Sequence, residues 1–102
     1  MATGTIKKQL SYIPVQMANI GTTSIYSFAR DTNNHQGLHF LYVQNSTDNP
    51  LSSTAAYAIL DKPTDNGDYS TALVFGNGNI RISTQLGTSA TAFTWKTVTI
   101  AS

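Results

Sequence analysis

Short stretches in which apolar and polar residues alternate, separated by polar turns, run along most of the chain. Seven of them have the length of a strand, at residues 5–12, 24–28, 38–44, 55–60, 69–75, 79–84 and 92–100. Alternation with a period of two indicates strands that turn one face toward a core, and turns at this spacing are typical of sandwiches and barrels. The pattern predicts an all-β fold, an antiparallel β-sandwich of about seven strands, in a single compact domain covering residues 1–102.

Two stretches carry more specific information. Residues 38–44 are almost continuously apolar, which predicts a central strand buried on both faces. Asn77 and Gly78 separate two apolar runs, and an Asn-Gly pair suits a tight hairpin because both residues tolerate positive φ. A single helical turn at residues 51–56 remains an alternative to loop or strand.

The last stretch changes parity midway. Phe93 and Trp95 share one parity, whereas Val98 and Ile100 share the other. A β-bulge near residues 96–97 would bring all four side chains to one face of the sheet. We therefore expect a bulge there and expect most aromatic side chains, including Trp95, to lie in the core.

The composition excludes several classes of function. Only 11% of the residues are charged, the formal net charge is +1, and Glu and Cys are absent, whereas there are ten Ser and fifteen Thr. Nucleic-acid binding needs clustered Lys and Arg, which this chain lacks. Without Cys there is no disulfide and no Cys-rich zinc site. No apolar run approaches the length of a membrane span, so we expect no membrane insertion.

Catalytic and metal-binding patterns are weak. The two histidines, His35 and His39, lie in a polar loop and in an apolar strand, and no G-x-S-x-G elbow accompanies them. They have no obvious third partner for a metal ion. Three carboxylates fall within residues 61–68, but the spacing of an EF-hand is missing, and an ordinary turn is favoured over a calcium site. We expect a protein that is not an enzyme and has no cofactor and no metal.

Two polar loops are the candidate ligand-binding segments, because binding residues concentrate on loops held by a rigid scaffold. Both combine carboxylate and amide groups with an imidazole or a phenol, which could bind sugar hydroxyls. The candidate residues are Asp31, Asn33, Asn34, His35, Asp65, Asn66, Asp68 and Tyr69. The sequence leaves open whether the loops lie at the same end of the domain, and whether both are ordinary solvated turns.

The C-terminal half, residues 55–100, resembles tail-fibre tip modules of the pyocin-knob kind. The matching stretches are Gly78-Asn79-Ile80-Arg81-Ile82 and Trp95-Lys96-Thr97-Val98, although members often carry Trp-x-x-Trp where this chain has Phe93-Thr94-Trp95. The resemblance implies a virion-exposed, usually trimeric module at a tail tip that recognises a host, often through surface glycans. It implies no catalytic residue.

These observations predict a non-catalytic receptor-binding domain, glycan-binding, at the tip of a phage-type tail fibre or spike. Its partners would be a host cell-surface glycan or protein receptor and further copies of itself, as a homo-oligomer and most often a trimer, since a small core without disulfides gains stability by association. Its location would be the virion tail or the extracellular space. The alternative is a structural trimerisation, collar or decoration domain without a ligand, and a fragment of a longer fibre or baseplate protein fits either reading.

Overall fold

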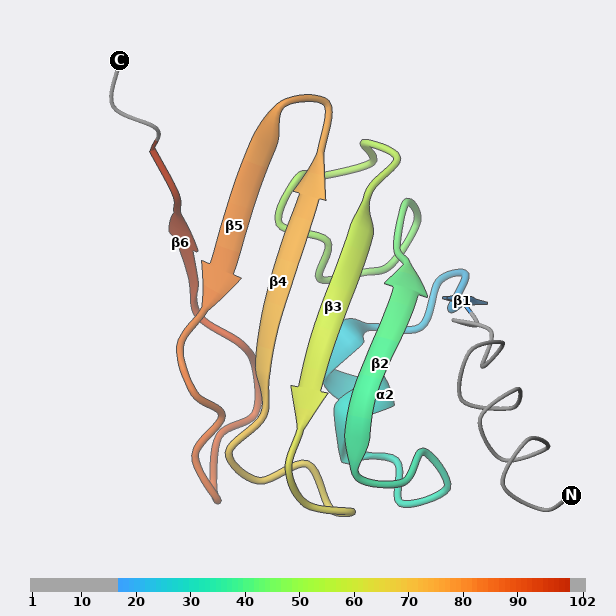
Figure 1. Cartoon of the computed structure of the whole chain (residues 1–102), viewed down its shortest axis with the longest axis vertical. Helices are drawn as coiled ribbons and strands as arrows, with labels where there is room; N and C mark the ends of the chain where they lie inside the picture. Colours follow the sequence, from blue (N-terminus) through green and yellow to red (C-terminus); the bar gives the residue numbers. More distant parts are fainter. Residues whose placement is uncertain (1–16, 100–102) are drawn as a thin grey trace, which may run out of the picture.

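Residues 17–99 of the computed structural model form one six-stranded mixed sheet with a short helix behind it (Figure 1). The elements are β1 (Met17–Asn19), α2 (Ile25–Arg30), β2 (Gly37–Tyr42), β3 (Tyr57–Lys62), β4 (Thr71–Gly76), β5 (Asn79–Ser83) and β6 (Trp95–Thr97). The strand order in the sheet follows the chain, with β1 parallel to β2 and every other pair antiparallel. Only these residues are described, so the strand predicted at residues 5–12 lies outside them.

The β-rich architecture with little helix is confirmed, whereas the sandwich of seven antiparallel strands is not. The described residues build one sheet, and β1 breaks the antiparallel pattern. Parallel neighbours cannot be joined by a tight hairpin and need a crossover, which is usually helical. Here α2 provides that crossover between β1 and β2.

The strand predicted at residues 24–28 is wrong, because this segment forms α2. The Ser24 hydroxyl accepts a hydrogen bond from the Ser27 amide at 2.9 Å, as an N-cap residue does. The carboxylate of Asp48 accepts two more, from the amides of Ile25 (2.6 Å) and Tyr26 (3.0 Å). These bonds satisfy amides that a helix start leaves without partners, so a segment of ambiguous periodicity becomes helical.

The core lies between the sheet and α2 with its flanking loops. Register places Leu41, Ala58 and Val74 side by side on the face toward the helix, and all three are buried. Ile25 and Ala29, four residues apart on α2, are fully buried against this face. Trp95 packs against the same cluster, as predicted.

The opposite face of the sheet is also apolar, and we call it the apolar sheet face. One row across β2 to β5 consists of Phe40, Ile59, Leu73 and Ile82. The next row consists of Tyr42, Tyr57, Phe75 and Ile80. The prediction that residues 38–44 are buried on both faces is wrong within the described part of the chain. Leu41 and Val43 are buried, but Leu38 is 60% exposed, because no described layer packs on this side.

The hairpin predicted at Asn77 and Gly78 is confirmed. Gly76 pairs with Asn79, so the loop has two residues, and both have positive φ, 50° at Asn77 and 78° at Gly78. Two consecutive positive φ values define the type I′ turn, whose twist matches that of the flanking strands.

The bulge predicted near residues 96–97 is wrong. The pairs Arg81–Thr97, Ile82–Lys96 and Ser83–Trp95 follow one another without an inserted residue. Phe93 precedes β6 and reaches the core from a loop, so strand parity does not apply to it. Val98 consequently lies on the apolar sheet face and is 39% exposed. Its backbone amide donates a hydrogen bond to the Ile80 carbonyl.

Candidate functional site

The two predicted ligand loops lie at the same end of the sheet, which the sequence had left open. β2 begins, β3 ends and β4 begins at this end, so residues 31–36 and 63–70 are neighbours (Figure 1). The Asp65 carboxylate accepts the Gln36 amide at 2.8 Å and lies 3.9 Å from the His35 ring nitrogen Nδ1. The antiparallel order of β2 to β4 therefore brings most of the predicted residues into one region.

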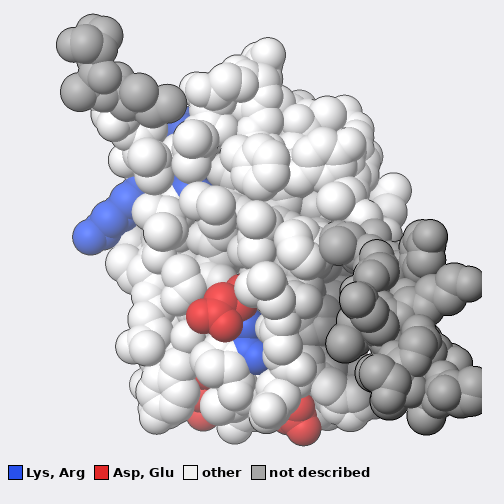
Figure 2. Space-filling model, viewed as in Figure 1, with Lys and Arg blue, Asp and Glu red and all other residues white. Residues whose placement is uncertain are grey.

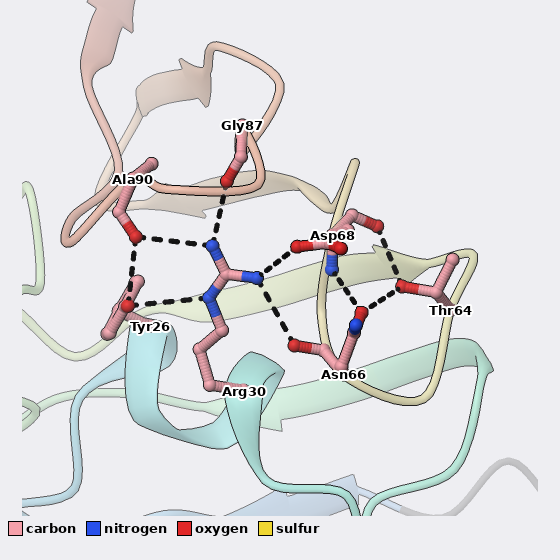
Figure 3. Close-up of polar contacts among 7 residues, drawn as sticks. All are labelled: Tyr26, Arg30, Thr64, Asn66, Asp68, Gly87 and Ala90. Carbon is pink, nitrogen blue, oxygen red and sulfur yellow. Dashed lines mark hydrogen bonds and ion pairs between the residues drawn. The ribbon is translucent and has the colours of Figure 1, made fainter.

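Arg30, at the end of α2, holds this region together (Figure 3). Its Nη1 donates to the Asp68 carboxylate at 2.6 Å and to the carbonyl of Asn66 at 3.2 Å. Its Nη2 donates to the carbonyls of Gly87 (2.8 Å) and Ala90 (3.2 Å), in the loop between β5 and β6. One guanidinium thus ties the helix to two loops.

Tyr26 completes this arrangement, which we call the Arg30 clamp. Its hydroxyl accepts from Arg30 Nε at 3.3 Å and donates to the Ala90 carbonyl at 3.0 Å, and the Arg30 guanidinium carbon lies 5.5 Å from the Tyr26 ring centre. Burial alone would lower the pKa of Arg30, but its hydrogen bonds to Asp68 and Tyr26 outweigh this effect, and the pKa is raised. The Arg30 guanidinium, which is already protonated at neutral pH, therefore keeps its charge in the clamp.

Lys62, the last residue of β3, holds the first predicted loop, residues 31–36, in place. Its side chain has no exposed surface, and its ammonium donates to the carbonyls of Asp31 (2.6 Å) and Asn34. Desolvation lowers the pKa of Lys62, and the negative charges of Asp65 and Asp31 offset this only in part. Lys62 thus fixes the loop through two of its backbone carbonyls.

Several of the predicted ligand residues are used to hold these loops in shape. The Asp31 carboxylate accepts the Asn33 amide (2.9 Å), and the Asn34 amide group donates to the Phe28 carbonyl (3.1 Å). Asn66 Oδ1 accepts from the Thr64 hydroxyl and from the Asp68 amide. These are the local bonds with which Asp and Asn shape turns.

Three of the exposed predicted residues, Asn33, His35 and Tyr69, make no side-chain hydrogen bond among the described residues. Asn33 is exposed, the His35 side chain is 80% exposed, and Tyr69 is 48% exposed with a φ of 68°. Tyr69 donates its amide to the Leu86 carbonyl at 2.7 Å, which places it beside the loop between β5 and β6. Asn33 and His35 belong to the other loop, so the exposed groups are divided between two parts of this end.

An open pocket of about 400 Å³ lies between β1 and α2, next to the first loop. Its lining joins apolar and polar groups. The lining residues are Ala18, Asn19, Ile20, Thr23, Ser27, Phe28, Asp31 and Asn34. Asp31 and Asn34 were predicted as ligand residues, and the pocket brings them beside Phe28 and Ser27.

The α2 side of this pocket was not predicted, because the apolar spacing in residues 24–28 also fits a strand. The available signal was Ser24 followed by Ile25, Phe28 and Ala29, a capping residue before apolar positions spaced i, i+3 and i+4. As a helix, the segment brings Ser27 and Phe28 into the pocket lining together with Asp31 and Asn34. The pocket therefore depends on the formation of α2.

Within residues 17–99, no group of three or more His, Asp or Glu side chains is placed to hold a metal ion. No helix in this range has both the length and the apolar character that crossing a bilayer requires. No protein-family model, curated protein or solved structure matches this chain. Arguments about function therefore rest on the geometry described above.

Proposed function

We propose that this chain is a non-catalytic receptor-binding module that takes a host-surface glycan in the pocket between β1 and α2, as the tip domain of a phage-type tail fibre or spike. Its place would be the virion tail or the extracellular space. The observation that carries the proposal is the pocket itself, of about 400 Å³, where Phe28 lies beside Asp31 and Asn34.

The chemistry of the pocket suits a neutral sugar. Sugar hydroxyls need donors and acceptors in fixed positions, and the C–H faces of the ring need apolar contact. The second carboxylate oxygen of Asp31 and the Oδ1 of Asn34 have no hydrogen-bond partner among the described residues. Ser27 and Thr23 add hydroxyl groups, and Phe28 supplies the apolar wall. Lys62 and the α2 cap hold these groups on a rigid frame, which limits the entropy lost on binding.

A second candidate is a structural domain of a virion, a trimerisation, collar or decoration module with no ligand. The observation that favours it is the use of Asp68, Asn66 and Asp65 in holding loops together. In that case the loops shape the end of the domain and the pocket stays empty of sugar.

A glycan array probed with the full chain and two matched variants tests the proposal. Thr23→Trp places an indole in the pocket, whereas Thr22→Trp puts the same group on the neighbouring exposed residue, which does not line it. We expect the parent and Thr22→Trp to bind the same glycan and Thr23→Trp to lose at least tenfold in affinity. His35→Ala and Tyr69→Ala, which alter exposed side chains outside the pocket, should bind as the parent does. Absence of glycan binding by the parent, or equal binding by both Trp variants, would favour the structural candidate.

A further inference from the structure

Asparagine followed by glycine occurs twice in the chain, at Asn66-Gly67 and at Asn77-Gly78. In such a pair the backbone nitrogen of the glycine can attack the side-chain amide carbon Cγ of the asparagine, because glycine has no Cβ to obstruct the approach. The attack requires a glycine N–H that is not hydrogen-bonded and an asparagine side chain that can rotate toward it. The two pairs differ in both respects.

The Asn66-Gly67 pair is held at both reacting groups. The side-chain oxygen Oδ1 of Asn66 accepts hydrogen bonds from the Thr64 hydroxyl at 2.8 Å and from the Asp68 amide at 3.1 Å. The Gly67 amide donates to the Thr64 carbonyl at 3.1 Å. Gly67 also lies against α2, where an added Cβ would be 2.4 Å from the Ala29 carbonyl oxygen. Cyclisation at Asn66 therefore requires this loop to open first.

The Asn77-Gly78 pair lies in the exposed two-residue turn between β4 and β5. Asn77 accepts a hydrogen bond at its backbone carbonyl, from Asn79 Nδ2 at 3.2 Å. Within residues 17–99, its side chain and the Gly78 amide make no hydrogen bond. A Cβ built on Gly78 would meet nothing within 4 Å, and an open hollow of about 390 Å³ lined by residues 75–80 lies beside the turn. Both reacting groups are thus accessible to water while the sheet stays intact.

We infer that Asn77 is a site of spontaneous deamidation and that the fold protects Asn66. The difference is structural, because the two pairs have the same dipeptide sequence. A turn at the free end of a hairpin opens locally at little cost, whereas the carbonyl of Asn66 is fastened to α2 by Arg30. The inference goes beyond glycan binding and does not rest on it, since the turn lies at the end of the sheet opposite residues 31–36 and 63–70 (Figure 1).

The reaction needs water as its co-reactant and neither an oxidant nor a reductant. The Gly78 nitrogen loses its proton to solvent hydroxide and forms a bond to Asn77 Cγ. The bond from Cγ to Nδ2 breaks, and the amide nitrogen leaves as ammonia after taking a proton from water, which closes a succinimide ring. Water then opens the ring at one of its two carbonyls and gives either aspartate or isoaspartate, in which the main chain runs through Cβ and Cγ. Overall, each converted residue consumes one water and releases one ammonia.

Either product changes the charge at this end of the molecule. One negative charge is added to a chain whose formal net charge is +1, so the product is neutral. On the face shown in Figure 2, the acidic side chains of the described residues lie in the middle and at the lower end, away from the upper end where Figure 1 places the turn. Deamidation therefore introduces an acidic group where this face has none.

The two products differ in their effect on the hairpin. Aspartate suits a type I′ turn as asparagine does, because it too tolerates positive φ. Isoaspartate adds one backbone atom to a loop of two residues and so cannot keep that geometry. The turn is therefore preserved in the aspartate product and disrupted in the isoaspartate product.

Peptide mapping by mass spectrometry of the full chain, incubated in mildly alkaline buffer, tests the inference. We expect Asn77 to convert at least about tenfold faster than Asn66, since opening of the loop adds to the barrier at Asn66. In concentrated urea the two rates should agree to within about threefold, because unfolding removes the protection. Equal rates in the folded chain, faster conversion of Asn66, or a tenfold difference that persists in urea would overturn the inference.

Two matched variants identify the source of the ammonia. Asn77→Asp and Asn45→Asp each add the same charge at an exposed residue, but only the first removes the reactive amide. We expect Asn77→Asp to lose most of the ammonia release of the parent and Asn45→Asp to retain it. Ammonia release by Asn77→Asp at the rate of the parent would contradict the assignment to Asn77.

Discussion

Lys62 is charged and yet has no exposed surface. Burying an ammonium is costly unless its donors are used, and two of its three bond to the carbonyls of Asp31 and Asn34. The lysine thereby supplies the partners that these loop carbonyls would otherwise find in water. The first predicted loop is therefore held in place by a residue that has no exposed surface.

The lowered pKa of Lys62 makes stability depend on pH in a defined direction. Between the lowered value and the ordinary 10.5, the unfolded chain holds a proton that the folded chain has released, so the free energy of unfolding rises with pH. We expect the parent to gain stability relative to Lys62→Met as pH increases through that window. Urea unfolding of both proteins from pH 7 to 10 measures this, and a difference that stays constant with pH would contradict it.

Gly67 allows the second loop to touch the end of α2. A Cβ added there would lie 2.4 Å from the Ala29 carbonyl oxygen, and its φ of 88° disfavours any side chain. We expect Gly67→Ala to lower the free energy of unfolding by about 2 kcal/mol or more. Gly87→Ala is the matched control, since nothing lies within 4 Å of the added carbon and no positive φ is required, and thermal unfolding should show it close to the parent.

At the scale of elements, α2 depends on a residue far away in the sequence. Asp48 caps it from a loop between β2 and β3, through two backbone amides. We expect Asp48→Ala to cost about 1–2 kcal/mol and Thr47→Ala, on the exposed neighbour, to cost little. Urea titration followed by circular dichroism compares them. Equal stability of the two variants would show that Ser24 alone suffices as a cap.

The same helix shows what sequence can and cannot predict here. The turn at Asn77 and Gly78 was predictable because its cause is local, two residues that accept positive φ. The six residues of α2 are too few to distinguish a period of 3.6 from a period of 2, and the Asp48 cap is set by tertiary structure. The predicted loops did contain two residues of the pocket, but its α2 wall followed from the helix and was missed.

At the scale of the whole molecule, the Arg30 clamp joins α2, the loop before β4 and the loop before β6. Lysine carries the same charge but lacks the planar set of donors, so Arg30→Lys should still lose about 1–3 kcal/mol of stability. Arg81→Lys is the control, because among residues 17–99 its guanidinium makes a single hydrogen bond, to the Ile80 carbonyl. Urea unfolding measures the free energy of unfolding of both variants. A similar loss in the two would show that the clamp adds little to stability.

The strand order of the sheet, identical to the order along the chain, also has a kinetic consequence. Each strand from β2 to β6 finds its partner among its sequence neighbours, and the loop between β4 and β5 is the shortest. Short loops lose the least entropy on closing, and local contacts speed folding. We expect this hairpin to nucleate the sheet and β1, which must wait for the helical crossover, to join last. Amide hydrogens of β1 should then exchange with solvent sooner than those of β3 and β4.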